Sequence, residues 1–259
     1  PARMAPFELL QPASLGEALT FLDAADARAF SGGTALMLMM KAGVLRPKRL
    51  VSLRRLGMER IEANGSLRIG AMATLRSLET SDAVRQGWPV IARTLRMLSN
   101  VRVRNVATVG GALAHADPHM DLPPLFCALG ARVTIEGKEG RRTAPMEELY
   151  AGYLETTLKP GELITELEVP ALGKRRAAYL KCTTRSADDW PAVGVAVALG
   201  GEDRIFVSAA TDRPTRISGE KALAGLKIES DLHGSADYKK QLLRVYLKRA
   251  IDEARNARR

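Results

Sequence analysis

Two glycine pairs are the residues of this chain best suited to hold an anionic ligand. They are Ser31-Gly32-Gly33-Thr34 and Thr108-Val109-Gly110-Gly111. Glycine lets a backbone approach a ligand closely and tolerates positive φ. A strand–glycine–helix junction also offers unpaired N–H groups and the positive end of a helix dipole, and the flanking threonines add hydroxyl donors. Such a junction suits a pyrophosphate. Neither pair matches the G-x-G-x-x-G fingerprint or a phosphate-binding loop ending in G-K-[S/T], so a standard Rossmann domain or ATPase is not supported.

The most polar cluster is the run from His115 to Asp121, which reads H-A-D-P-H-M-D. Pro118 disfavours a regular helix that would bring His115 and His119 onto one face, and no third histidine is nearby. Aspartates that bind sugar hydroxyls therefore fit this run better than metal ligands do, and the plain alternative is a loop with Asx turns. Lys181 and the mixed-charge segment 185–190 form a second polar region, for which surface turn chemistry is the plain alternative.

No residue set indicates acid–base or nucleophilic catalysis. The sequence contains no arguable Ser/His/Asp or Cys/His arrangement and no pair of carboxylates that stands out. Its two cysteines, Cys127 and Cys182, have no partners at metal-site spacing, which excludes an all-cysteine iron–sulfur cluster or zinc site within this sequence. If the protein is an enzyme, a bound cofactor is expected to perform the difficult chemistry.

Composition and charge narrow the class of protein. The 259 residues suggest one large or two modest domains, and 46% hydrophobic residues suffice for a core. No apolar run approaches the roughly 20 residues of a membrane span, and residues 1–12 do not resemble a secretory segment, so a soluble cytoplasmic protein is expected. The formal net charge of +10 favours anionic partners. Part of this positive charge lies in residues 239–259, where eight basic residues stand against two acidic ones. This segment is either a solvated face or a docking surface.

The elements that position these residues fall into three blocks, of about 1–55, 56–172 and 175–259. In the first block, a short strand at 29–30 runs into the first glycine pair and then into a helix at 35–41. In the second block, helices are expected at 89–99 and 125–129, and a cleanly alternating strand at 161–170. In the third block, strands are expected at 177–183, 193–199 and 204–209, and helices at 219–224 and 238–256.

Taken together, these motifs resemble a known family. The chain resembles the FAD-binding medium subunit of the molybdenum hydroxylases, the family of xanthine dehydrogenase, aerobic carbon monoxide dehydrogenase and the bacterial aromatic-ring hydroxylases. The resemblance covers essentially the whole chain. The stretches that carry it are Phe30–Leu36, Ile69–Leu75, Arg104–Pro118 continuing to Asp121, Lys181–Arg185 with Asp188 and Asp189, and the tail Asp231–Tyr238.

The resemblance implies an α+β protein with an FAD-binding domain of the vanillyl-alcohol-oxidase type, also called PCMH-type. Two α/β subdomains, about 1–55 and 56–172, would clasp the cofactor, and together they would form the FAD-binding domain 1–172. A C-terminal α+β domain, 175–259, with a small antiparallel sheet and helices, would pack beside them.

The resemblance also assigns residues to FAD and none to catalysis or metal binding. Ser31 to Ala35 would wrap the pyrophosphate through backbone N–H groups, and the second glycine pair would approach it from the other subdomain. Asp121 and Asp117 would bind hydroxyls of the FAD, and Ile164 and Lys181 would lie near the isoalloxazine. The full set is Phe30, Ser31, Gly32, Gly33, Thr34, Ala35, Leu36, Thr74, Thr108, Gly110, Gly111, Ala112, Asp117, Asp121, Ile164 and Lys181.

Two positions depart from the family pattern. Ala112 stands where the family usually has Asn, and Ala35 replaces a commonly polar residue. The loss of two neutral hydrogen bonds would weaken FAD binding by about 1–3 kcal/mol, which a site built mainly from backbone donors tolerates.

The function implied is that of an FAD-dependent electron-transfer subunit. A large partner subunit would hold the molybdenum cofactor, and a small one would hold two [2Fe–2S] clusters that deliver electrons to this FAD. A dimer of heterotrimers would result, with no nucleic acid and no membrane span. The substrate would bind to a different subunit, and the acceptor could be NAD, oxygen or quinone. Two alternatives stay open: a stand-alone FAD-dependent oxidoreductase of the same fold, and a basic module that binds nucleotides or nucleic acid.

Overall fold

A three-stranded parallel sheet forms the N-terminal part of the computed structural model, which describes residues 4–257. Its strands, in order across the sheet, are β1 (Glu8–Leu10), β3 (Arg49–Ser52) and β2 (Ala27–Phe30). Helix α1 (Leu15–Leu22) packs on this sheet, and α2 (Leu36–Lys41) follows β2. The expected N-cap of α1 is present, because the Ser14 hydroxyl accepts a hydrogen bond from the N–H of Glu17. The first glycine pair therefore lies between β2 and α2.

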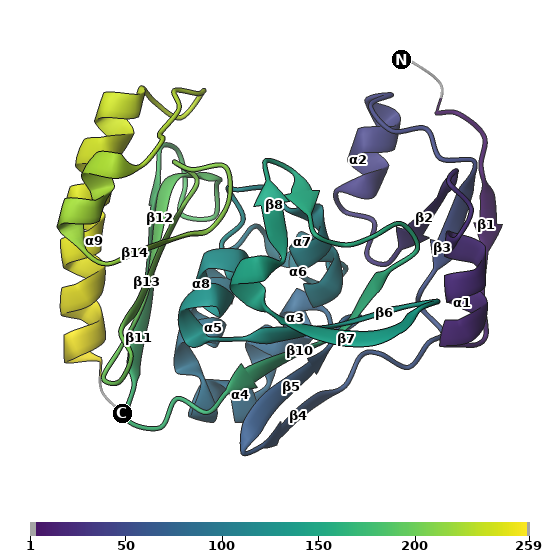
Figure 1. Cartoon of the computed structure of the whole chain (residues 1–259), viewed down its shortest axis with the longest axis horizontal. Helices are drawn as coiled ribbons and strands as arrows, with labels where there is room; N and C mark the ends of the chain where they lie inside the picture. Colours follow the sequence, from purple (N-terminus) through teal and green to yellow (C-terminus); the bar gives the residue numbers. More distant parts are fainter. Residues whose placement is uncertain (1–3, 258–259) are drawn as a thin grey trace.

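The central part is a five-stranded antiparallel sheet covered by helices (Figure 1). Its order is β4 (Ile61–Asn64), β5 (Ser66–Gly70), β10 (Leu163–Pro170), β6 (Arg132–Gly137) and β7 (Gly140–Pro145). The largest core lies between this sheet and its helices. The helices are α3 (Leu75–Thr80), α4 (Asp82–Gly87), α5 (Pro89–Arg96), α6 (Val101–Arg104), α7 (Val109–His115) and α8 (Leu122–Leu129). A 3-10 turn, η1 (Met146–Glu148), leads to a small ribbon of β8 (Tyr150–Gly152) and β9 (Glu155–Thr156).

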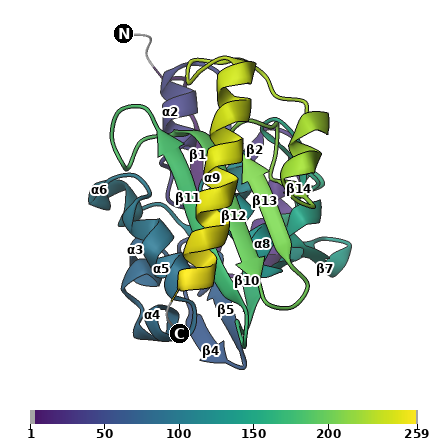
Figure 2. The same cartoon turned by 90° about the vertical axis from the view of Figure 1, so that its left-hand side faces the viewer.

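The C-terminal part is a four-stranded antiparallel sheet with helices on both faces. Its strands follow the chain: β11 (Arg176–Thr183), β12 (Pro191–Leu199), β13 (Arg204–Ser208) and β14 (Thr215–Ile217). Helix α9 (Ala236–Asn256) lies across one face, as Figure 2 shows, and α8 packs on the other. Because β12 is buried on both faces, its sequence is a continuous apolar run instead of an alternating one.

The mixed α and β architecture with a small antiparallel C-terminal sheet confirms the expected fold class. Several helix boundaries differ from the expected ones, for local reasons. The helix expected at 89–99 ends at Arg96, and Ser99 adopts a φ of 52°. The helix expected from Leu125 begins at Leu122, because prolines at 123 and 124 are compatible with a first helical turn. The helix expected at 219–224 is a 3-10 turn, η2 (Glu220–Gly225). Within residues 4–257, no helix has the length and apolar character of a membrane span.

Candidate functional site: a cavity bordered by two glycine turns

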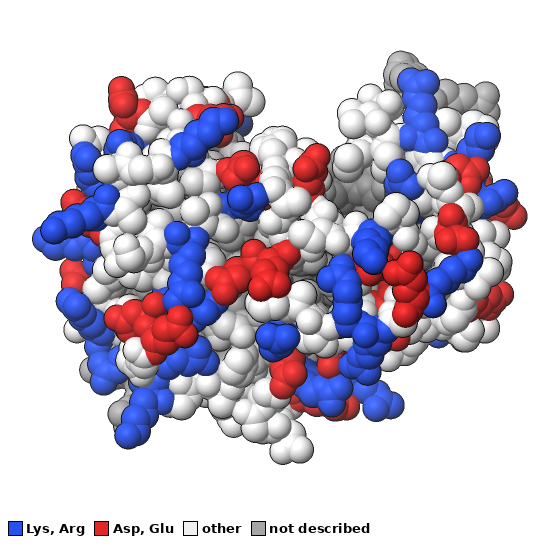
Figure 3. Space-filling view, in the orientation of Figure 1, with Lys and Arg blue, Asp and Glu red and all other residues white. Residues whose placement is uncertain are grey.

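A cavity of about 1000 Å³ lies between the N-terminal sheet and the helices of the central part. It opens as the cleft at the upper edge of Figure 3, beside the lobe that carries α2. Its walls come from the β2–α2 turn, helix α7, the start of β10 and the loop before α8. Small-molecule sites typically measure about 300–1,000 Å³, so this volume suits a ligand as large as a dinucleotide.

The first glycine turn presents free backbone donors to this cavity. Gly33 has a φ of 72°, and the ring of Phe30 occupies the space that a Cβ at this position would need. Among the described residues, the turn's N–H groups at positions 32, 33, 34 and 35 donate to no protein acceptor, and all four residues line the cavity. Successive free N–H groups next to a left-handed residue form a concave binding surface for an anion.

The second glycine turn lines the cavity, but its N–H groups are already used. Val109 donates to the carbonyl of Ala73 at 2.9 Å, and Gly110 donates to the carbonyl of Ala71 at 2.8 Å. The N–H of Gly111 donates to the Thr108 hydroxyl at 3.2 Å, which caps α7. This turn therefore supplies a side-chain-poor wall, and the free donors come from the first turn.

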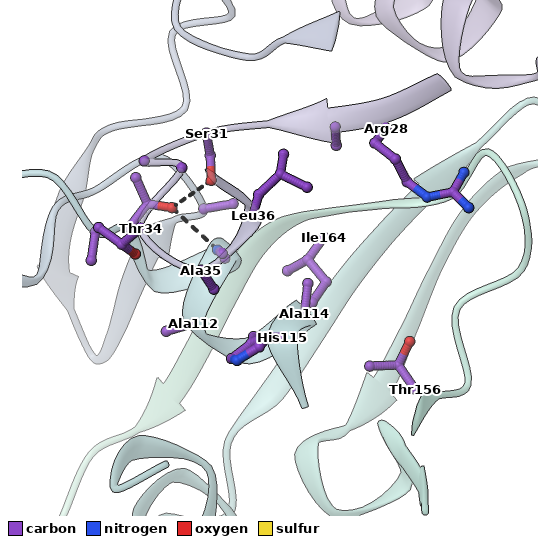
Figure 4. A pocket seen from close by; sticks show the side chains of 18 of the residues that line it. Arg28, Ser31, Thr34, Ala35, Leu36, Ala112, Ala114, His115, Thr156 and Ile164 are labelled. Atoms are coloured by element: carbon purple, nitrogen blue, oxygen red, sulfur yellow. Dashed lines mark hydrogen bonds between the residues drawn. The ribbon is translucent and has the colours of Figure 1, made fainter. Parts of the chain in front are cut away.

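The two turns, 77 residues apart, touch each other. The Thr108 hydroxyl donates a hydrogen bond to the Ser31 hydroxyl at 3.0 Å, shown as a dashed line in Figure 4. A Cβ added to Gly32 would lie 2.2 Å from the carbonyl oxygen of Val106. This close approach leaves room only for glycine at position 32. The two glycine turns, which were expected to meet, therefore lie on one side of the cavity.

Asp121 lies at another wall, in a buried ionic network. Its Oδ1 accepts a hydrogen bond from the Tyr179 hydroxyl at 2.6 Å, and its Oδ2 accepts one from Nζ of Lys181 at 3.2 Å. Burial raises the pKa of Asp121 above its usual 3.8, and Lys181 and Tyr179 act against this rise. Lys181 also donates to the carbonyls of Met97 and Asp189, so its donors are occupied within the protein.

Most of the sequence-predicted residues line the cavity. They are Ser31, Gly32, Gly33, Thr34, Ala35, Leu36, Thr108, Gly110, Gly111, Ala112, Asp121 and Ile164. In Figure 4 the labelled residues of the first turn and α2 face Ala112, Ala114 and His115, and Arg28 and Thr156 lie farther along the cavity.

Four of the expected residues lie outside this lining. Phe30 packs against Gly33, and Thr74 caps α3 by accepting from the N–H of Ser77. Asp117 pairs with His119. Lys181, expected near the isoalloxazine, is buried with a side chain that is only 4% exposed.

Several lining residues were not expected from the sequence. They include Arg28, His115, His119, Met72 and the segment 158–163. His115, His119 and Met72 stand in stretches that the sequence analysis singled out as polar or family motifs, so a local signal for them existed. Arg28 and the segment 158–163 stand in no such stretch, and strand pairing and loop packing bring them to the cavity. Within the described part of the chain, no three His, Cys, Asp or Glu side chains form a group that could hold a metal.

The network around Asp121 yields a first prediction. In Lys181→Met, Asp121 keeps Tyr179 as its partner and can take up a proton, because burial already raises its pKa. We therefore expect a loss of about 1–3 kcal/mol in the free energy of unfolding, measured by chemical denaturation. The matched control is Lys138→Met, which removes a half-exposed pair with Asp23 and should change stability by less than about 1 kcal/mol. Equal losses in the two variants would contradict the account.

Comparisons with known proteins now define the class. Residues 5–172 match the family described as the FAD binding domain in molybdopterin dehydrogenase. The chain belongs to this family, and it is an FAD-binding medium subunit of the molybdenum hydroxylase type and an FAD-dependent oxidoreductase subunit. The cavity, the four free N–H groups and the glycine contact between the turns fit this cofactor.

Individual relatives agree with this assignment. The chain is 31% identical to the carbon monoxide dehydrogenase medium chain of Hydrogenophaga pseudoflava, with 96% of each protein covered. It is 29% identical to the glyceraldehyde dehydrogenase medium chain of Sulfolobus acidocaldarius, over 95% of this chain and 98% of that protein. A solved carbon monoxide dehydrogenase from Hydrogenophaga pseudoflava superposes with a TM-score of 0.92 at 30% identity, covering 97% of this chain and 98% of that chain. Quinoline 2-oxidoreductase from Pseudomonas putida 86 gives 0.89 at 28% identity, with 97% and 98% covered.

Proposed function

We propose that this chain binds FAD in the cavity and carries electrons between a partner subunit and an external acceptor. A small partner subunit with two [2Fe–2S] clusters delivers the electrons, and a large subunit holds the molybdenum cofactor that acts on the substrate. The complex is a dimer of heterotrimers. FAD, when bound, supplies the ability to accept electrons singly and release them singly or in pairs. Residues 1–172 form the FAD-binding domain and residues 175–259 the C-terminal domain.

The observation that carries this proposal is the set of free donors beside the contact between the turns. Four consecutive backbone N–H groups, at positions 32 to 35, lack a protein acceptor within residues 4–257 and belong to residues that line the cavity. A pyrophosphate would give these groups charged acceptors, and hydrogen bonds to charged groups contribute about 1.5–3 kcal/mol each. Ala35 and Ala112 do not weaken this part of the site, because it consists of backbone groups.

Other residues of the cavity bind the cofactor through hydroxyl and apolar contacts in this proposal. Each carboxylate oxygen of Asp121 accepts one hydrogen bond from the protein and keeps capacity for a cofactor hydroxyl. Leu36 and Ile164 offer apolar surface to the cofactor. Lys181 acts indirectly, by holding Asp121 in place.

Native purification tests the proposal against its alternatives. The absorption spectrum of the purified protein should show flavin bands, and mass spectrometry should find FAD, iron and molybdenum together with two further chains. Flavin without these chains and metals would favour a stand-alone FAD-dependent oxidoreductase. A colourless protein that binds nucleic acid in a salt-sensitive way would contradict the proposal and favour the basic binding module.

A further inference from the structure

His119 is held at the edge of the cavity by two carboxylates from distant parts of the chain. Its Nδ1 lies 3.0 Å from Oδ1 of Asp117, and its Nε2 lies 3.2 Å from Oδ2 of Asp231. The His119 side chain is largely buried and lines the cavity. Asp117 belongs to the loop between α7 and α8, whereas Asp231 precedes α9. The imidazole therefore joins the cavity to the segment 231–239.

The two contacts require a particular protonation state of the ring. A neutral imidazole has one N–H donor and one lone pair, and an ionised carboxylate only accepts hydrogen bonds. In its neutral form, His119 would direct a lone pair at one carboxylate oxygen. Both contacts are hydrogen bonds only when the ring is an imidazolium.

The other hydrogen-bond partners of the two carboxylates determine which contact a neutral His119 ring would lose. Asp231 also pairs with Nζ of Lys239, a side chain only 1% exposed, and accepts from the N–H of His233 at 2.8 Å. In the described part of the chain, the other donor to the carboxylate of Asp117 is the backbone N–H of His119, at 2.9 Å. The negative charge of the Asp231 carboxylate is therefore better balanced by nearby donors than that of Asp117. The remaining proton therefore stays on Nδ1, toward Asp117, and the contact with Asp231 fails.

Aromatic rings and further carboxylates surround His119. The rings of His233 and Trp190 lie 5.2 and 5.7 Å from the His119 ring, between centroids. Burial and the carboxylates of Asp117 and Asp231 raise the pKa of Tyr153 above 10.0, so Tyr153 stays neutral near neutral pH. Beside Trp190, the carboxylate of Asp188 accepts from the Ser186 hydroxyl, and that of Asp189 accepts from the N–H of Trp190.

We propose that His119 is a positioning residue whose protonated ring clasps the segment 231–239 to the edge of the cofactor cavity. With both contacts made, the segment and the rings beside it are held at this edge, and FAD leaves slowly. When the contact with Asp231 is lost, they move more freely at this edge, and FAD leaves faster. The part that concerns FAD rests on the proposed function.

Two measurements on the full-length chain test the clasp. Long-range 1H–15N spectra of the chain without FAD should show the His119 ring as an imidazolium that is hydrogen-bonded through both nitrogens. On the FAD-loaded chain, flavin fluorescence should show release about tenfold faster from His119→Gln than from the wild type, which corresponds to about 1.4 kcal/mol.

Variants separate the charge from the shape of the ring. His119→Arg keeps a positive charge and several donors and should release FAD about as slowly as the wild type does. In His119→Gln the charge is lost and both side-chain donors sit on one nitrogen, so FAD should leave quickly. Glu229→Gln is the control, because it removes an exposed pair with Lys227 just before the same segment and should release FAD as the wild type does.

A neutral His119 ring, or FAD release from His119→Gln at the wild-type rate, would overturn the clasp. A chain that binds no FAD would instead overturn the proposed function. The ring spectra, recorded without FAD, test the clasp in that case too.

Discussion

Replacing Gly32 with alanine is expected to reduce the affinity for FAD by about 100-fold or more. The new Cβ would lie 2.2 Å from the carbonyl oxygen of Val106 and 2.9 Å from Cα of Ala107. Both obstacles are backbone atoms, so the two glycine turns must move apart. The loss of two of the charge-assisted hydrogen bonds proposed for the pyrophosphate, at about 1.5–3 kcal/mol each, accounts for the size of the effect. Titration of the apo chain with FAD measures it.

Two further glycine variants make this prediction specific. Gly16→Ala adds a methyl group in α1 with nothing within 4 Å, and it should bind FAD as the wild type does. Gly111→Ala would meet only the hydroxyl oxygens of Ser31 and Thr108, at 2.8 and 2.9 Å, and these side chains can rotate, so an intermediate loss is expected. Wild-type affinity in Gly32→Ala would show that the contact between the turns does not position the cofactor.

Replacing Glu79 with alanine is expected to lower the free energy of unfolding by about 3–5 kcal/mol. Glu79 and Arg104 are both buried, and Nε of Arg104 donates to Oε2 of Glu79 at 2.9 Å. Arg104 also donates to the carbonyl of Leu98 at 2.8 Å, and it stands two residues before Val106. Removing Glu79 leaves a buried guanidinium without its carboxylate and loosens the segment that meets Gly32, so FAD affinity should fall as well.

The same pair predicts a dependence of stability on pH. Burial alone would raise the pKa of Glu79, but hydrogen bonds from Arg76 and Arg104 outweigh burial and hold this pKa below 4.5. A carboxylate with a lowered pKa in the folded state stabilises the protein fully above its unfolded pKa, and this contribution is lost as the pH falls through the folded value. Denaturation between pH 7 and pH 3 should show this component in the wild type and not in Glu79→Gln.

A surface pair provides the control for Glu79. Glu166 pairs with Arg68, whose side chain is half exposed, and Glu166→Gln should change stability by less than about 1 kcal/mol. A loss in Glu79→Ala no larger than the loss in Glu166→Gln would contradict the importance of the buried pair.

The first glycine turn could be predicted from the sequence because part of its requirement is local. A strand, a glycine pair and a helix follow one another at residues 27–41, and the positive φ of Gly33 needs no information from elsewhere in the chain. Ile164 and Asp121 entered the expected set through the family resemblance, and both line the cavity.

Other features depend on contacts between distant residues and could not be predicted in this way. Alternation along β11 does not reveal that Lys181 meets Asp121, 60 residues earlier, and is thereby kept out of the cavity. The glycines of the second turn were expected to approach the pyrophosphate, and in the structure Gly110 lies against Ala71. Their sequence could not show that the N–H groups of this turn already bond to Ala71, Ala73 and Thr108. His119 meets Asp231 across 112 residues, and only tertiary packing brings the two together.

Comparing the affinity of the apo chain for FAD and for riboflavin tests the central claim most directly. Riboflavin has the same ring but no pyrophosphate, so the free N–H groups of the first turn gain no charged acceptor. We expect calorimetric titration to show FAD bound at least about 100-fold more tightly than riboflavin, with most of this difference lost in Gly32→Ala. Equal affinities for the two ligands, or an undiminished difference in Gly32→Ala, would contradict a pyrophosphate site at the first glycine turn.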